Sequence, residues 1–246
     1  MTAAEVRSAV VTVGGGFMTS QQMRAQEDAM GLPPRSLYFR GRSAVLGEPP
    51  PGVVAATFGI FPDRLVEAVI TGTTALPAAA AVSAYGRACA AWGVDHLSGV
   101  VAAGEAAELL YDVADATDPG ALPLFAGWRT QQRPREAPAR LAHALMVVRE
   151  LRGGLHFAAL RACGLSVIEA TVVEPAGGRE RLLRTGWSSD AADALVRSAA
   201  NRADLPERWR RAEQMTEDSF GRCVRSLGPQ RAARLHELLP SLVPSG

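Results

Sequence analysis

The stretch "ARLAHALMVVRELRGGLHFAAL", residues 139–160, decides the fold class of this chain. Its first apolar residues recur three or four positions apart, which is the spacing of one face of an α-helix: Leu141, Leu145, Val148 and Leu151. Gly153 and Gly154 follow, and they predict a break because glycine costs about 1 kcal/mol against alanine inside a helix. We expect a second helix from His156 toward Val173, although the β-branched residues at its end also suit a strand.

The same periodicity extends outward in both directions. It predicts further helices in these ranges: 3–13, 20–30, 62–70, 77–92, 97–116, 190–202 and 206–243. The segment 116–138 is expected to be a loop with an apolar island at 122–128 that covers a core or a pocket. The sequence therefore predicts a mainly α fold, with a helical N-terminal domain at 1–138 and a C-terminal module at 139–246.

Composition excludes several classes of protein. The 246 residues are 48% hydrophobic and 21% charged, with a net charge of +1, so bulk charge does not favour nucleic acid or an anionic membrane. No apolar stretch is long and regular enough to span a bilayer, and the N-terminus lacks the pattern of a signal peptide. Three widely spaced cysteines indicate neither a disulfide framework nor a zinc site. We expect a cytoplasmic protein that does not bind membranes.

The candidate catalytic residues centre on two histidines. His143 and His156 lie on the two helices expected on either side of the glycine break, so folding at the break would let them share a cavity. Acid–base chemistry by these rings, polarised by Arg149, Arg152 or Glu169, is the most economical catalytic hypothesis. The alternative is that each histidine is a hydrogen-bonded core or surface residue. No metal and no cofactor are expected, because the ligand spacings of zinc sites are missing.

Candidate ligand-binding residues are aromatic or basic, and core packing is the alternative for the aromatic ones: Phe17, Tyr38, Phe39, Arg42 and Trp128. The run "TVGGGFMTS", residues 12–20, lacks the glycine spacing and the lysine of a phosphate loop. We interpret Gly14, Gly15 and Gly16 as a helix interruption that opens space in a pocket. A small-molecule substrate or ligand is the expected partner.

Several stretches together resemble the SalK/EvbL-type helix-turn-helix family, whose members occur around secondary-metabolite gene clusters of GC-rich bacteria. These stretches are "SLYFRGRSAVLGEPPPGVVAATFGIFP" (36–62), "LPLFAG" (122–127), "ARLAHALMVVRELRGGLHFAALRACGLSVIEA" (139–170) and "GWSSD" (186–190). The resemblance covers nearly the whole chain. It implies a helical N-terminal domain joined to a winged-helix module, with a poorly defined biochemical role.

The resemblance also bears on the site residues. The family's Tyr-Phe-x-Gly-Arg motif falls on residues 38–42, and its histidines fall on His143 and His156. The acidic position of the Arg-Gly-Asp-Gly-His segment has become Gly154 here, and an N-terminal family histidine falls on Val13. If those groups act in relatives, the resemblance implies an altered or lost activity in this chain.

A second departure from the family lies at the wing. Residues 201–205 run directly into Pro206, which leaves almost no room for a β-hairpin. The expected recognition helix carries Asp190 and Asp193, which oppose the phosphate neutralisation that supplies much of the affinity for DNA. We therefore expect a winged-helix-like module with a reduced or missing wing, and DNA as the less favoured partner.

Three hypotheses about function follow. The first is an acid–base tailoring enzyme of secondary metabolism, for instance antibiotic biosynthesis, of the cyclase, isomerase or lyase type. The alternative is a ligand-responsive helix-turn-helix transcriptional regulator, and the third is a partner-binding protein without chemistry. A leucine stripe near the C-terminus suits either internal packing or the seam of a homodimer, and the sequence leaves both open: Leu235, Leu238, Leu239 and Leu242.

Overall fold

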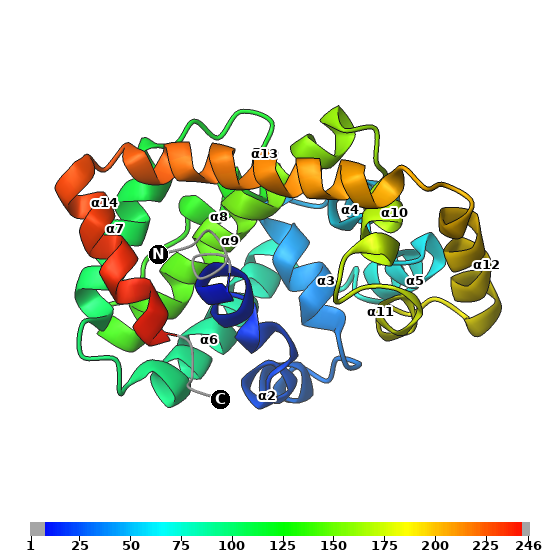
Figure 1. The fold of residues 1–246 in the computed structure, drawn as a ribbon. Helices are drawn as coiled ribbons and strands as arrows, with labels where there is room; N and C mark the ends of the chain where they lie inside the picture. Colours follow the sequence, from blue (N-terminus) through cyan, green and yellow to red (C-terminus); the bar gives the residue numbers. More distant parts are fainter. Residues whose placement is uncertain (1–7, 243–246) are drawn as a thin grey trace. The chain divides into compact units, whose positions relative to one another are not determined.

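The computed structural model describes residues 8–242, and every regular element in that range is a helix (Figure 1). No strand occurs between residues 8 and 242, so the predicted mainly α fold is confirmed. The winged-helix assignment itself stays a prediction. Only residues 201–204 separate the helix that ends at Ala200 from the one that begins at Leu205, which fits the expected lack of a wing.

The chain divides into two compact units, each built from separated segments. The first unit is formed by the described parts of Met1–Glu48, Leu76–Gly154 and Ser219–Gly246, and the second by Pro49–Ala75 and Leu155–Asp218. These units are not the segments 1–138 and 139–246, and the division into those two domains stays a prediction. Each unit is described below by itself.

The first unit holds most of the helices. They are η1 (Ser8–Val13), η2 (Gly16–Thr19), α2 (Gln21–Ala29), α3 (Ser36–Ser43), η3 (Ala44–Leu46), α6 (Ala78–Leu97), α7 (Ala103–Ala116), α8 (Pro123–Arg129), α14 (Pro229–Leu238), η4 (Leu239–Leu242), the start of α9 (Ala137–Ala162) and the end of α13 (Leu205–Arg225). Helix α6 packs against α2 and α3. Ser20 caps α2, because its side chain accepts a hydrogen bond from the Met23 backbone N–H.

Glycines let the helices of the first unit approach closely. A Cβ atom on Gly93 of α6 would lie 2.6 Å from the Cβ of Ala142 on α9. A Cβ on Gly41 of α3 would lie 2.9 Å from the Cβ of Tyr85 on α6. Neither distance is tolerated between real side-chain atoms, so these contacts require glycine.

Helix α9 runs without interruption from Ala137 to Ala162, so the predicted break at Gly153 and Gly154 is wrong. The physical reason is packing, which overrides the helix propensity of glycine. A Cβ on Gly154 would lie 2.5 Å from the Cδ2 of Leu122. Gly154 therefore makes room for a buried leucine and does not end the helix.

The apolar island at 122–128 is also a helix and not a loop. Pro123 begins α8 at a position where its missing N–H costs nothing. Phe125 and Trp128 of this helix are almost completely buried. The expectation that the island covers a core is confirmed, because these side chains form part of the core of the first unit.

No single helix between residues 8 and 242 is long and apolar enough to cross a membrane. Helices α9 and α10 (Val167–Val173) together have the length and composition of a membrane span, but they are bent by 95° at the break between them.

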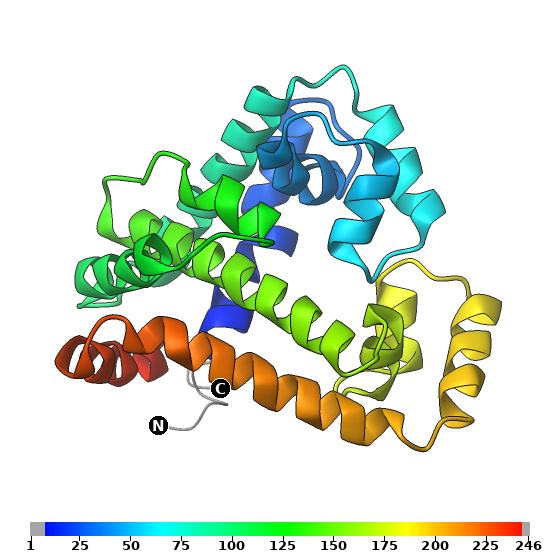
Figure 2. The same cartoon turned by 90° about the horizontal axis from the view of Figure 1, so that it is seen from above.

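The second unit is smaller and carries three short helices in succession (Figure 2). Its elements are α4 (Pro51–Phe58), α5 (Asp63–Gly72), α10, α11 (Arg179–Arg184), α12 (Ser189–Ala200), the end of α9 and the start of α13. Helices α10, α11 and α12 pack against one another, and α4 packs against α5. One cluster of its core consists of small and aliphatic side chains: Ala159, Leu160, Cys163, Leu165, Ala170, Ala199, Leu205 and Ala212.

Serine caps define where the short helices begin. Ser166 and Glu169 form a capping box, in which each side chain accepts a hydrogen bond from the other residue's backbone N–H. This box resolves the ambiguity of the β-branched segment that follows it in favour of a helix. Ser188 caps α12 by accepting a hydrogen bond from the Ala191 N–H.

Candidate functional site

His143 lies in the first unit, on α9, and is 4% exposed. Its Nδ1 is 2.8 Å from the hydroxyl of Tyr111, and its Nε2 is buried without a hydrogen-bond partner. Burial, together with the charges of Arg133 and Arg140, lowers the pKa of His143 to about 4. The ring is therefore neutral at physiological pH and has one free nitrogen.

His156 lies in the second unit, on the same helix. Its Nδ1 is 3.2 Å from the Thr216 hydroxyl and 3.2 Å from a carboxylate oxygen of Glu213. Thirteen residues of continuous α-helix place the two histidines about 20 Å apart along the axis. The expectation that a helix break folds them toward one cavity is therefore wrong.

Arg149 and Glu169 lie apart from the histidines. Arg149 is 3.5 Å from Glu150 in the first unit, whereas Glu169 belongs to the capping box and pairs with Arg202 at 2.6 Å in the second. Of the four predicted catalytic residues, His143 lines a cavity of the first unit, and none of the four lines the cavity of the second unit. Their catalytic role stays a prediction.

Most of the predicted ligand-binding aromatics lie in the core of the first unit. Phe17, Phe39 and Trp128 are at most 1% exposed. The ring centroid of Tyr85 lies 4.9 Å from that of Phe17 and 5.0 Å from that of Trp128. The Trp128 indole N–H donates a hydrogen bond to the Arg42 carbonyl at 3.0 Å. These contacts are those of core packing, which is the alternative interpretation of the aromatic residues.

Arg42 forms a buried ion pair that the sequence did not predict. Its guanidinium donates two hydrogen bonds of 2.8 Å to the two carboxylate oxygens of Glu150. Burial raises the pKa of Glu150, but the charges of Arg42 and Arg149 outweigh this and hold the pKa below its ordinary value. Tyr38 lies beside Arg42, with its hydroxyl 3.4 Å from the guanidinium.

The three glycines at 14–16 do not open space. A Cβ on Gly14 would lie 2.4 Å from the Val10 carbonyl oxygen, and one on Gly16 would lie 2.6 Å from the Trp92 ring. A Cβ on Gly15 would lie 2.9 Å from the Nε of Arg149. The interpretation of these residues as the opening of a pocket is wrong, since they are packed against neighbouring atoms.

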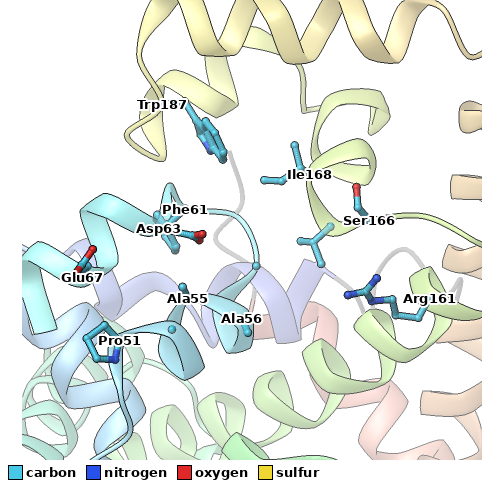
Figure 3. Close-up of a pocket in the computed structure, with 13 residues that line it drawn as sticks. Pro51, Ala55, Ala56, Phe61, Asp63, Glu67, Arg161, Ser166, Ile168 and Trp187 are labelled. Atoms are coloured by element: carbon cyan, nitrogen blue, oxygen red, sulfur yellow. The ribbon is translucent and has the colours of Figure 1, made fainter.

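The second unit contains a cavity of about 670 Å³ (Figure 3). Pro51, Ala55 and Ala56 of α4 form one side, and Trp187 and Ile168 lie on another. The Trp187 indole N–H donates a hydrogen bond of 3.0 Å to the Ile60 carbonyl. Trp187 immediately precedes Ser188, the cap of α12, so one wall of the cavity is continuous with the start of that helix.

Trp187 is not among the site residues predicted from the sequence. The signal available was its position, because a tryptophan directly before a serine helix cap must lie where the chain turns. Its partners, Ile60 and the helix α4, are more than a hundred positions away in sequence. Sequence periodicity carries no information about such a contact.

Some arginines of α11 and α12 form ion pairs in the described chain, and others do not. Arg179 pairs with Asp193 at 2.6 Å, and Arg181 pairs with Glu174 at 3.0 Å. Arg184 and Arg197 are exposed, and the described residues provide neither with an ion-pair partner. The second unit as a whole has ten arginines against twelve acidic residues.

The first unit contains a separate cavity of about 850 Å³. His143 and Trp128 are both among its lining residues, so the structure brings one predicted catalytic and one predicted ligand-binding residue to the same place. Within residues 8–242 there is no group of three or more side chains suited to hold a metal ion.

Comparison with curated proteins and with solved structures gives no match for this chain. A helix-turn-helix family matches residues 3–244, which is nearly the whole chain. This match does not distinguish the SalK/EvbL type or an association with gene clusters, and both stay predictions. The chain belongs to a helix-turn-helix family.

Proposed function

We propose that this protein is a ligand-responsive helix-turn-helix transcriptional regulator, in which α12 contacts DNA and the cavity of the second unit holds the effector. One observation carries the proposal: Trp187 is both a wall of that cavity and the residue before the cap of α12. A ligand that displaces the Trp187 ring would act directly on the start of the helix. Family membership supports the DNA-binding part.

The charges around α11 and α12 define the expected DNA contacts. Arg184 and Arg197 are the exposed arginines of these helices without an ion pair in the described chain, so they are available to phosphates or base edges. Asp190 is exposed in the first turn of α12 and repels phosphate. The unit's slight acidic excess predicts weak sequence-independent affinity, so that recognition depends on a few contacts.

The test is an electrophoretic mobility shift with the DNA that flanks the protein's own gene, measured across a salt series. Replacing Arg184 or Arg197 by alanine should weaken binding and reduce the salt slope by about 1 each. Arg211→Ala on α13 is the matched control, since Arg211 is also an exposed arginine of the second unit. Asp190→Asn should strengthen binding. If wild-type protein gives no salt-sensitive shift, the regulator hypothesis is wrong.

A variant at Gly52 tests whether the cavity is coupled to DNA binding. Gly52 lines the cavity, and a Cβ at this position would meet nothing within 4 Å. Gly52→Leu adds a bulky side chain to the cavity lining at a position with room for its Cβ, and it should change DNA affinity at least about fivefold, the lower range of allosteric coupling. Unchanged affinity would show that the cavity is not linked to α12.

The acid–base enzyme hypothesis has less support. His143 and His156 are separated along one helix, and Glu169 is engaged in a cap and an ion pair. A neutral His143 with a pKa of about 4 is also a weak general base at pH 7. A small-molecule ligand and a homodimer stay predictions of the sequence.

A further inference from the structure

The charged side chains that line the cavity of the first unit are all basic. Arg87, Arg133 and Arg135 are among its lining residues, and no aspartate or glutamate is. Its volume of about 850 Å³ lies in the range of small-molecule sites. An electropositive cavity of this size favours an organic anion over a neutral or cationic ligand.

Two of the three arginines are free to bind a carboxylate. Arg133 pairs with Asp115 and stacks over the Tyr111 ring, with its central carbon 4.1 Å from the ring centroid. Arg87 donates hydrogen bonds only to neutral groups in the described chain, the Gln26 side chain and the Ser83 hydroxyl. Arg135 is exposed and has no ion-pair partner in the part of the chain that the structure describes.

Helix α6 forms an apolar wall of small side chains. Ala79, Val82, Gly86 and Ala90 recur at helical spacing and all line the cavity. A Cβ atom on Gly86 would meet nothing within 4 Å, so this glycine faces open space and is not required for helix packing. The wall can therefore accept a flat or extended apolar group.

His143 supplies a buried polar group with an unused bonding position. The residue lines the cavity and is 4% exposed, its Nδ1 faces Tyr111, and its Nε2 has no partner. A buried unsatisfied nitrogen costs free energy unless a ligand or water completes it. A hydroxyl is suited to this position, because it can donate or accept and so fits either tautomer of the ring.

We infer that this cavity binds a small organic carboxylate whose apolar body lies on α6 and which also carries a hydroxyl group. Arg87 and Arg135 bind the carboxylate, and His143 Nε2 hydrogen-bonds the hydroxyl. The site is independent of the proposed DNA-binding function, since it lies wholly within the first unit.

The test is isothermal titration calorimetry of the full chain with 4-hydroxybenzoate, benzoate and 4-hydroxybenzamide. 4-Hydroxybenzoate should bind most tightly, and the uncharged amide should bind at least about tenfold more weakly, as expected for the loss of charge-assisted hydrogen bonds. Arg87→Gln or Arg135→Gln should bring the carboxylate and the amide to similar affinities. Arg211→Gln, at an exposed arginine that lines neither cavity, is the matched control and should change nothing.

Two further variants separate binding from folding. Gly86→Leu adds a bulky side chain at a lining position where a Cβ atom meets nothing within 4 Å, so it should abolish binding while the thermal midpoint stays the same or rises. Gly72→Leu, at another glycine with open space around it, should bind like wild type. His143→Leu should remove the preference for 4-hydroxybenzoate over benzoate. The inference is overturned if neither carboxylate binds more tightly than the amide, or if binding survives in Gly86→Leu.

Discussion

The two units of this protein differ in how deeply they bury an ion pair between an arginine and a carboxylate. The first unit buries one such pair, Arg42 with Glu150, whose side chains are 12% and 2% exposed. The arginine–carboxylate pairs of the second unit are more exposed, for example Arg202 with Glu169 at 40% and 28%. Buried pairs are costly to break, whereas exposed ones contribute little. The comparison predicts that breaking this buried ion pair of the first unit costs more free energy than breaking an exposed one of the second.

The largest test of this comparison is Glu150→Leu. The variant removes both 2.8 Å hydrogen bonds that the Arg42 guanidinium donates to the buried carboxylate, and the free energy of unfolding should fall by about 3–5 kcal/mol. Urea unfolding followed by circular dichroism measures the loss. Arg202→Met, which breaks an exposed pair of the second unit, is the control and should cost less than about 1 kcal/mol. Equal losses in the two variants would remove the distinction between the units.

A second test uses pH. The pKa of His143 is about 4 in the folded protein and about 6.5 in the unfolded chain. The unfolded state therefore takes up a proton first, so stability is complete above pH 6.5 and falls as pH decreases toward 4, by about 3 kcal/mol in total. His143→Phe should lose this dependence. His156→Gln, in the second unit, should retain it, and a wild-type curve that is flat over this range would contradict the prediction.

The smallest effect is expected at the second unit's capping box. Ser166→Ala removes the side-chain acceptor for the Glu169 N–H, and helix caps of this kind contribute about 1 kcal/mol. Thermal unfolding should show the loss. Ser166→Asp, which can still cap the helix, should restore most of it, and an alanine variant as stable as wild type would show that the box does not stabilise α10.

Local signals predicted much of this fold. The caps at Ser20 and Ser188 and the amphipathic helices α5, α6 and α7 follow from residues close together in the sequence. The wrong predictions concern residues whose surroundings depend on a contact with a residue far away in the sequence. Gly154 looks like a helix breaker locally, but the approach of Leu122 explains it, and Gly15 is adjacent to Arg149 rather than to empty space.

The candidate sites were predictable only in part. His143 and Trp128 were chosen for their residue types, and both line the cavity of the first unit. The arginines at 87 and 135 were not chosen, because nothing in the sequence shows that α6 and the segment after α8 border the same space. Trp187 was missed for the same reason, since its partner Ile60 lies far away in the chain.

The interleaving of the two units also constrains how the chain can fold during synthesis. The second unit needs α4 and α5 together with residues up to Asp218, and the first needs α14 as well. Neither can be completed while the ribosome is still making the middle of the chain. Helices α4 and α5 leave the ribosome early, but they cannot complete their packing until most of the remaining residues have been translated. We expect this protein to acquire its structure late in translation, and a fragment that stops before α13 to lack both units.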